Sequence, residues 1–282
     1  MQESVRRFVW IRVPSWLLVL VFCTTTLGFE VKTATFDDLI FHAQRYGNTK
    51  EKRADKAEAE KELFARGPES LRQLMAKIHF ENVGIAVLAQ NMVLQMDTQA
   101  VAQVLAEFLG ASEPAARKMA AFFLGLHDTP DYADRVVPLL ADDKAAGAAI
   151  RTLGKWRAQA AVPQIIPFLK HEKEPRRVAA ANALGEIGDP AAVPALVEAL
   201  GDPFFTVREA AARALTKPEL KAESALLEAL PGSSGAARRH IVRVLGQLKS
   251  SAAVPLLERL HEDPDPAVRD DAARALAAIR GV

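Results

Sequence analysis

Residues 253–279 read AVPLLERLHEDPDPAVRDDAARALAAI, and this stretch recurs three times upstream in drifting form, at residues 161–188, 192–215 and 223–248. Each copy holds an apolar residue that anchors a buried seam. These anchors are Leu184, Leu215, Leu245 and Leu276, spaced 31, 30 and 31 residues apart. A fixed period of this length is typical of a solenoid, in which each unit buries its apolar face against its neighbours. The sequence therefore predicts an array without a single compact core.

Each unit reads as a pair of helices. Abundant alanine and leucine favour helix, and the prolines at Pro163, Pro194 and Pro255 suit the first turn of a first helix, where a missing amide proton costs nothing. Gly185, Gly188 and Gly246 are expected to let the chain leave the second helix. The fold class predicted is all-α, an α-solenoid or superhelix.

The period continues backward through the anchors Leu153, Leu124 and Leu94. Seven units result, at residues 68–97, 98–128, 129–157, 158–188, 189–218, 219–249 and 250–280. Two further helices, at residues 36–46 and 49–66, are expected to cap the first unit, since solenoids need a polar end for solubility. The predicted domains are a signal peptide or N-terminal anchor (1–28), a helical cap (29–67) and the repeat solenoid (68–282).

The charge balance argues against two classes of partner. The chain has 36 basic and 35 acidic residues and a net charge of +1. Because no bulk field attracts polyanions, we expect neither nucleic acid nor a lipid surface as the partner of the folded chain.

The first 28 residues have the layout of a secretory signal. A basic start with Arg6, Arg7 and Arg12 precedes an apolar run at residues 16–22, and small and polar residues follow. This pattern predicts export to the periplasm or outside the cell, with cleavage before Phe29. The alternative is an uncleaved inner-membrane anchor over residues 8–29, which would be the protein's one membrane contact.

Cys23 is the only cysteine in the chain and lies directly after the apolar run. Export with cleavage would leave a mature chain without a thiol. Such a chain can form no disulfide, thiolate metal site or cysteine nucleophile.

The tract DPDPAVRDDAARALAAI, residues 263–279, resembles the consensus of HEAT repeats, in particular the short bacterial class first recognised in phycobilisome lyases. The resemblance covers about residues 98–280. It implies an armadillo-like superhelix but leaves the function open, because the family spans scaffolds, adaptors and a few enzymes.

Two catalytic relatives provide a test for chemistry. Deoxyhypusine hydroxylase binds iron through His-Glu pairs that open the second helix. Here the pairs His171-Glu172 and His261-Glu262 fall at the end of the first helix instead. The bilin lyases share only the repeats and act in the cytoplasm. The single histidines His42, His79 and His127 are expected to be structural or exposed, and we expect no catalytic residue, no metal and no cofactor.

One row of residues is expected on the concave face, two positions before each anchor: Arg151, Asn182, Arg213, Arg243 and Arg274. These positions lie about 200° round the helix from the anchor and so face outward. Glu209 precedes Arg213 by four residues, as Asp270 precedes Arg274, so solvated pairs within one helix are one interpretation. Capture of a protein partner is the other.

The sixth unit differs because its second helix carries four basic residues and no acid: Arg238, Arg239, His240 and Arg243. These residues either bind an anionic partner, such as an acidic peptide, or are simply exposed. The neighbouring Phe204 and Phe205 are unusual in an inter-helix turn. We expect one ring to pack against an adjacent turn, and an exposed second ring would suit a partner anchor.

A second set of arginines stands seven residues before the anchors, at Arg117, Arg177, Arg208, Arg238 and Arg269. The HEAT resemblance implies that these pair with turn aspartates such as Asp202 and Asp263, forming a ladder that joins successive units.

The sequence predicts a non-enzymatic scaffold or adaptor of the cell envelope that binds another protein or acidic peptide on its concave face. The alternative is an enzyme or maturation factor of the bilin lyase or deoxyhypusine hydroxylase type.

The export hypothesis predicts a mature chain that begins at Phe29, because signal peptidase removes the basic and apolar segments together. Intact-mass measurement of the protein from its native host checks this. A mass that includes residues 8–29 would contradict cleavage and favour the anchor.

Overall fold

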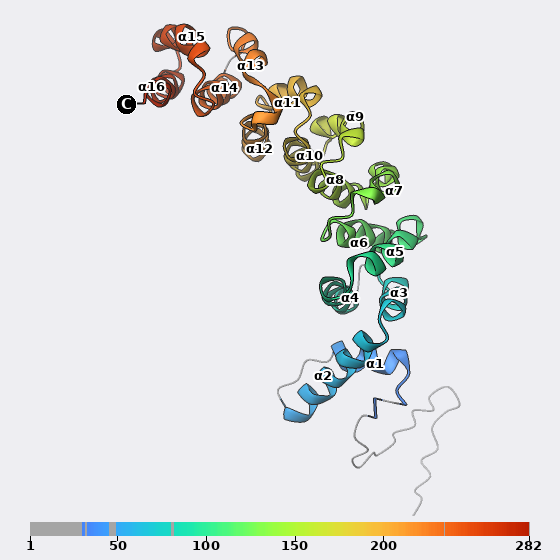
Figure 1. The fold of residues 1–282 in the computed structure, drawn as a ribbon. Helices are drawn as coiled ribbons and strands as arrows, with labels where there is room; N and C mark the ends of the chain where they lie inside the picture. Colours follow the sequence, from blue (N-terminus) through green and yellow to red (C-terminus); the bar gives the residue numbers. More distant parts are fainter. Residues whose placement is uncertain (1–29, 32, 45–48, 80–81, 234, 282) are drawn as a thin grey trace, which may run out of the picture.

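The computed structural model describes residues 30–31, 33–44, 49–79, 82–233 and 235–281. Over these ranges the chain is helical and has no strand. The helices stack in pairs along a curved rod (Figure 1), so the predicted α-solenoid is confirmed. The expected signal or anchor segment, with Cys23, lies outside the described residues. Within the described ranges, no helix combines the length and apolarity that crossing a bilayer requires.

The first helix of each pair lies on the outer side of the bend and the second on the inner, concave side (Figure 1). The first helices are α3 (Pro68–Ala76), α5 (Thr98–Glu107), α7 (Ala133–Val136), α9 (Val162–Ile165), α11 (Val193–Ala199), α13 (Glu223–Ala229) and α15 (Val254–Arg259). The second helices are α4 (Val83–Gln95), α6 (Pro114–Leu124), α8 (Ala146–Lys155), α10 (Glu174–Ile187), α12 (Phe205–Leu215), α14 (Gly235–Gln247) and α16 (Pro266–Arg280). Seven helix pairs are thus present in the described chain.

Short 3-10 helices flank several of the first helices and turn the chain between layers. They are η1 (Phe108–Gly110), η2 (Pro130–Tyr132), η3 (Val137–Ala141), η4 (Gln159–Ala161), η5 (Ile166–Lys170), η6 (Pro190–Ala192), η7 (Pro218–Leu220), η8 (Ser251–Ala253) and η9 (Leu260–Glu262). The prolines expected at the start of the first helices do occupy N1 or N2 positions, as at Pro163, Pro194 and Pro255.

The N-terminal cap consists of α1 (Phe36–Gln44) and α2 (Lys50–Ala65). Thr49 caps α2 by accepting a hydrogen bond from the Lys52 amide, as its type favours. Leu39 of α1 is fully buried, and Gln44 Nε2 donates to Asn82 Oδ1 at 3.3 Å. The cap therefore closes the apolar end of the first pair.

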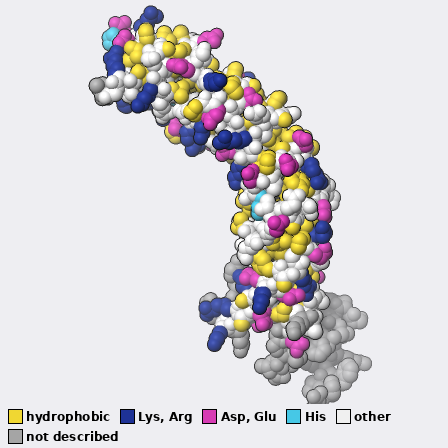
Figure 2. Space-filling view, viewed as in Figure 1, with side chains coloured by type: hydrophobic (Ala, Val, Ile, Leu, Met, Phe, Trp, Pro, Cys, Tyr) yellow, Lys and Arg dark blue, Asp and Glu magenta, His cyan; other side chains and the backbone are white. Residues whose placement is uncertain are grey.

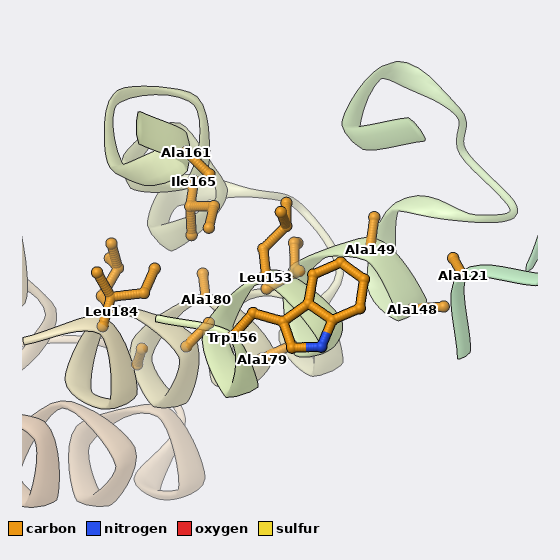
Figure 3. Packing of buried hydrophobic residues seen from close by; sticks show 14 of the residues in the cluster. Ala121, Ala148, Ala149, Leu153, Trp156, Ala161, Ile165, Ala179, Ala180 and Leu184 are labelled. Carbon is orange, nitrogen blue, oxygen red and sulfur yellow. The ribbon is translucent and has the colours of Figure 1, made fainter. Parts of the chain in front are cut away.

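The interior is one continuous seam of leucines and alanines that runs the length of the rod. Figure 3 shows Leu153 and Leu184 of successive second helices, with Ile165 of α9 beside them and small alanines where the helices approach. The predicted anchors Leu124, Leu153, Leu184, Leu215 and Leu245 are all fully buried.

One predicted anchor is wrong by a single residue. Leu94 is 57% exposed, whereas its neighbour Val93 is fully buried. A step of one residue turns a helix by about 100°, so the seam takes Val93 and leaves Leu94 on the surface. Leu276 is only partly buried, because no later helix of the described chain covers it.

Neighbouring second helices approach closely at glycines. A Cβ atom added to Gly185 would lie 2.7 Å from the Ala214 Cβ, and one added to Gly246 would lie 2.8 Å from the Ala275 Cβ. Both glycines lie inside their helices, so the expectation that they end the helix is wrong. Gly188 does end α10, in a left-handed conformation with φ of 75°.

Gly185→Ala is expected to lower stability, because the added methyl has no room against the backbone of α12. Glycine-to-alanine changes inside helices normally stabilise by about 0.5–1 kcal/mol, while overpacking costs about 1–3 kcal/mol. Urea unfolding followed by circular dichroism measures the sign. Gly110→Ala is the control, since nothing lies within 4 Å of its added Cβ; a stabilised Gly185→Ala would contradict the close contact.

Candidate binding face

The concave face carries the predicted row of polar side chains. Arg151, Asn182, Arg213 and Arg274 are exposed and Arg243 is partly exposed. Figure 2 shows Lys and Arg side chains along the inner edge of the C-terminal half of the rod. The helical geometry therefore places this row as expected, and its charge partners decide what it can bind.

The ladder arginines tie each inter-helix turn to the next. Arg177 donates from Nη1 to the carbonyls of His171 and Glu172 at 2.8 and 3.1 Å, and from Nε to Asp202 at 2.7 Å. The side chains of Arg177 and Asp202 are only 9% and 8% exposed. Such a bidentate, desolvated contact is the strong form of an ion pair.

The same contact recurs where an aspartate stands 25 residues after the arginine. Arg117 donates to Asp142 at 2.6 Å and to the Ala111 carbonyl at 2.7 Å. Arg238 pairs with Asp263 and also donates to the Ser233 carbonyl. This geometry places Arg238 in the ladder and not among residues free for a partner.

Arg208 and Arg269 complete only half of the ladder contact. Arg208 donates to the carbonyls of Asp202 and Pro203 at 2.7 and 2.9 Å, but Ser233 stands where its aspartate would be, and its Nε has no hydrogen bond. Arg269 donates to the Asp263 carbonyl at 2.7 Å, and the described chain holds no later turn for it to reach.

The basic cluster of the sixth unit is neutralised by the helices on either side. Arg239 Nε lies 2.8 Å from Asp271 Oδ2 of α16, and Arg243 Nη1 lies 2.9 Å from Glu209 Oε1 of α12. Own-helix acids are absent, as the sequence shows, but the neighbours supply them. Charge reversal at Arg239 and Arg243 would thus disturb these pairs as well as any partner contact.

His240 is 5% exposed and belongs to the interior. Its Nδ1 lies 2.8 Å from the Ala236 carbonyl and its Nε2 lies 3.1 Å from Glu209 Oε1. The ring therefore joins α14 to α12 at the junction where the ladder acid is missing. Its expected contact with a partner is corrected to this structural contact, since burial removes it from the surface.

The pairs made by Asp271 and Glu209 lower the pKa of these two carboxylates. Burial by itself would raise the pKa of Asp271, yet hydrogen bonds from Arg274 and Arg239 outweigh it and lower that pKa. Burial of Glu209 is likewise outweighed, chiefly by Arg243, so its pKa is lowered. Both groups are therefore held as carboxylates at neutral pH.

Arg213 and Arg151 differ from the basic cluster in their charge pairing. Glu209, expected to neutralise Arg213 within α12, faces α14 instead, and the Arg213 side chain donates to Asn182 Oδ1 at 3.5 Å. Among the residues that the structure describes, no carboxylate pairs with Arg151 or Arg213. Arg274 does pair with an acid of its own helix, although with Asp271 and not with Asp270.

A groove of about 460 Å³ lies between these two free arginines. It crosses three successive second helices, α8, α10 and α12. Its lining is Arg151, Lys155, Pro175, Val178, Ala179, Asn182, Ala183, Glu186 and Arg213.

Phe204 and Phe205 are 48% and 59% exposed. The guanidinium of Arg177 stands 5.2 Å from the centre of the Phe204 ring, and that of Arg208 stands 5.7 Å from the Phe205 ring. Phe204 also borders a turn-side groove of about 520 Å³. Each ring covers a ladder arginine while keeping an exposed face, and the partner-anchor role stays a prediction.

The histidines of the described chain show no metal-binding arrangement: no group of three or more His, Cys, Asp or Glu side chains in it could hold an ion. His171 Nδ1 accepts from the Lys173 amide at 3.0 Å. His127 lies between Thr98 Oγ1 at 3.2 Å and the Val93 carbonyl at 3.0 Å, a structural position.

Comparison with known proteins agrees with this architecture. The family model of HEAT repeats matches residues 141–216 and 223–282. This chain is a HEAT-repeat protein. The match is interrupted between α12 and α13, close to the junction where the ladder lacks its acid.

The chain is related to a protein named phycocyanobilin lyase subunit alpha from Nostoc, with 37% identity over 146 residues, which cover 44% of this chain and 53% of the relative. It spans about half the length of the curated relatives it matches.

Two solved structures are also similar. YibA of E. coli has 17% identity and a TM-score of 0.51, with 89% of this chain and 94% of that one covered, which supports the fold. The complex of CpcE and CpcF of phycocyanin lyase from Nostoc has 24% identity and a TM-score of 0.43, with 63% of this chain and 76% of that one covered.

From the sequence, Asp142 and Asp271 were missed as charge partners and Glu209 was assigned to Arg213. Asp142, Glu209 and Asp271 each neutralise an arginine of another unit. The signal for Asp142 was present, because it follows Arg117 by the same 25 residues that separate Arg177 from Asp202. Glu209 and Asp271 follow no such repeat spacing and required the packed helices.

Arg177→Ala is expected to destabilise the array by about 3–5 kcal/mol, because it leaves the buried Asp202 carboxylate without its cation. Arg208→Ala is the matched control at the equivalent position, where no acid is paired, and should cost clearly less. Urea unfolding of both variants gives the comparison; equal losses would contradict the ladder as a source of stability.

Proposed function

We propose that this protein is a partner-binding subunit of a maturation assembly of the phycocyanobilin lyase type. The observation that carries the proposal is the 37% identity to phycocyanobilin lyase subunit alpha. The name of that relative describes one subunit of a lyase, so its activity belongs to an assembly. This similarity favours a maturation factor over a free-standing scaffold.

The geometry of the chain supports a binding role within such an assembly. The grooves of the described chain are open furrows on the surface of the solenoid, lined by charged and small apolar side chains. General acid–base or nucleophilic chemistry needs a base and a reacting group held together away from water. We therefore infer that this chain binds a protein partner and that the attachment chemistry takes place in the assembled complex.

A metal-dependent function of the deoxyhypusine hydroxylase type has no supporting observation. The positions that would carry its His-Glu pairs hold Val178-Ala179, Glu209-Ala210, Arg239-His240 and Asp270-Asp271. None provides a histidine followed by a glutamate.

Location is a separate proposal. Export of the mature chain is inferred from the layout of residues 1–28. The resemblance to bilin lyases implies the cytoplasm instead. The mass of the mature chain therefore also indicates in which compartment the partner should be sought.

The lyase-type proposal predicts that the tagged protein co-purifies with a second subunit in fixed stoichiometry. It also predicts that the pair, but not this chain alone, attaches phycocyanobilin to an acceptor protein. Native mass spectrometry measures the stoichiometry, and visible absorbance retained by the denatured acceptor measures attachment. A protein that remains alone in its native host, or a reconstituted pair without attachment, would refute the proposal. Bound iron in stoichiometric amount would favour the hydroxylase type.

A further inference from the structure

We propose that the groove across α8, α10 and α12 is the contact site for an acidic segment of the partner protein, with Arg151 and Arg213 as its anion-binding residues. This inference rests on the proposed function and names the chemistry of its partner. It places the binding site in the middle of the array and not at the basic cluster of the sixth unit, where the sequence predicted it.

The first support is the pairing state of the concave row. Arg243 is held by Glu209 and Arg274 by Asp271, so a partner would have to compete with a carboxylate already in place. Arg151 and Arg213 have no such competitor among the described residues. A free guanidinium can bind a carboxylate with two parallel hydrogen bonds at full strength.

The second support is that Arg213 is left free by a fixed arrangement. His240 is buried, and its Nε2 faces Glu209 while Arg243 donates to the same carboxylate oxygen. Two groups of α14 therefore hold Glu209 away from Arg213. Because the ring of His240 is also tied to the Ala236 carbonyl, this orientation is built into the junction of the two helices.

The third support is the composition of the groove. Its basic residues are Arg151, Lys155 and Arg213, and Glu186 is its one acid. Lys155 Nζ donates to the Gly125 carbonyl at 3.0 Å, and no carboxylate among the described residues pairs with it. Basic side chains on both sides of a groove favour a complementary, negatively charged surface and repel a basic one.

The residues at the floor of the groove favour a peptide over a polyanion as the occupant. Val178, Ala179 and Ala183 of α10 provide an apolar strip between the two arginines. Such a strip can cover apolar side chains of a peptide, while a nucleic acid would present a continuous run of phosphates to it and to Glu186. A net charge of +1 gives no further attraction for a polyanion.

Helix packing gives the length of the occupant. Neighbouring packed helices lie about 8–10 Å apart, so α8 and α12 are roughly 16–20 Å apart. An extended chain rises about 3.3 Å per residue, so roughly five or six residues span from Arg151 to Arg213. The expected segment therefore has acidic residues at both ends and apolar residues between them.

Binding of a fluorescein-labelled peptide, Glu-Glu-Leu-Ala-Leu-Glu-Glu, to the full protein tests this inference by fluorescence anisotropy at low salt. The wild type should bind saturably, and the double change Arg151→Glu with Arg213→Glu should weaken binding at least tenfold. The control is Lys170→Glu with Arg259→Glu, an equal change in net charge on exposed residues of the outer layer, which should leave binding unchanged.

No saturable binding by the wild type, equal weakening in the control, or full binding by the Arg151 and Arg213 variant would each overturn the inference. Circular dichroism of both variants confirms that they keep their helices. The proposed function is judged separately, on the second subunit. If that subunit stays bound when Arg151 and Arg213 are reversed, this inference fails while the proposed function stands.

Discussion

The structure depends on the contact between one inter-helix turn and the next, made by an arginine that binds both. In the Arg177–Asp202 pair, one guanidinium satisfies the carbonyls of its own turn and the aspartate of the following one. A solenoid has no central core, so its stability is a sum of such neighbour contacts. Where Ser233 replaces the aspartate, His240 and Arg243 reach back to Glu209 and supply the contact between units.

The same contacts determine which charges remain available for binding. A row of arginines on a concave face looks uniformly basic from the sequence, but each residue can be neutralised by the helix before or after its own. Arg239 and Arg243 are paired in this way and Arg274 is paired within its own helix, whereas no carboxylate of the described residues pairs with Arg151 or Arg213. The face that we propose for partner binding is therefore narrower than the row and lies over the groove of α10.

The sequence was sufficient for the fold because a 30-residue period and helical spacing depend on local pattern alone. It located the buried anchors except at Leu94, where the weak first unit allowed an alignment shifted by one residue. It predicted the ladder partners Asp202 and Asp263 but not the partners of Arg239 and Arg243, because there it considered only acids on the same helix, and the pairing of Glu209 with α14 depends on how neighbouring helices are aligned. The close approach at Gly185 was missed for the same reason, since only the adjacent helix makes a glycine necessary there.

The pairing state of the arginines is the central claim, and reaction with phenylglyoxal, followed residue by residue with mass spectrometry, tests it most directly. Arg274 is the key comparator because it is 68% exposed yet paired with Asp271. Arg151 and Arg213 should react well before Arg274, Arg243 and the buried Arg177. Reaction of Arg274 and Arg243 as fast as that of Arg151 and Arg213 would contradict the claim that pairing with a carboxylate decides which arginines are free.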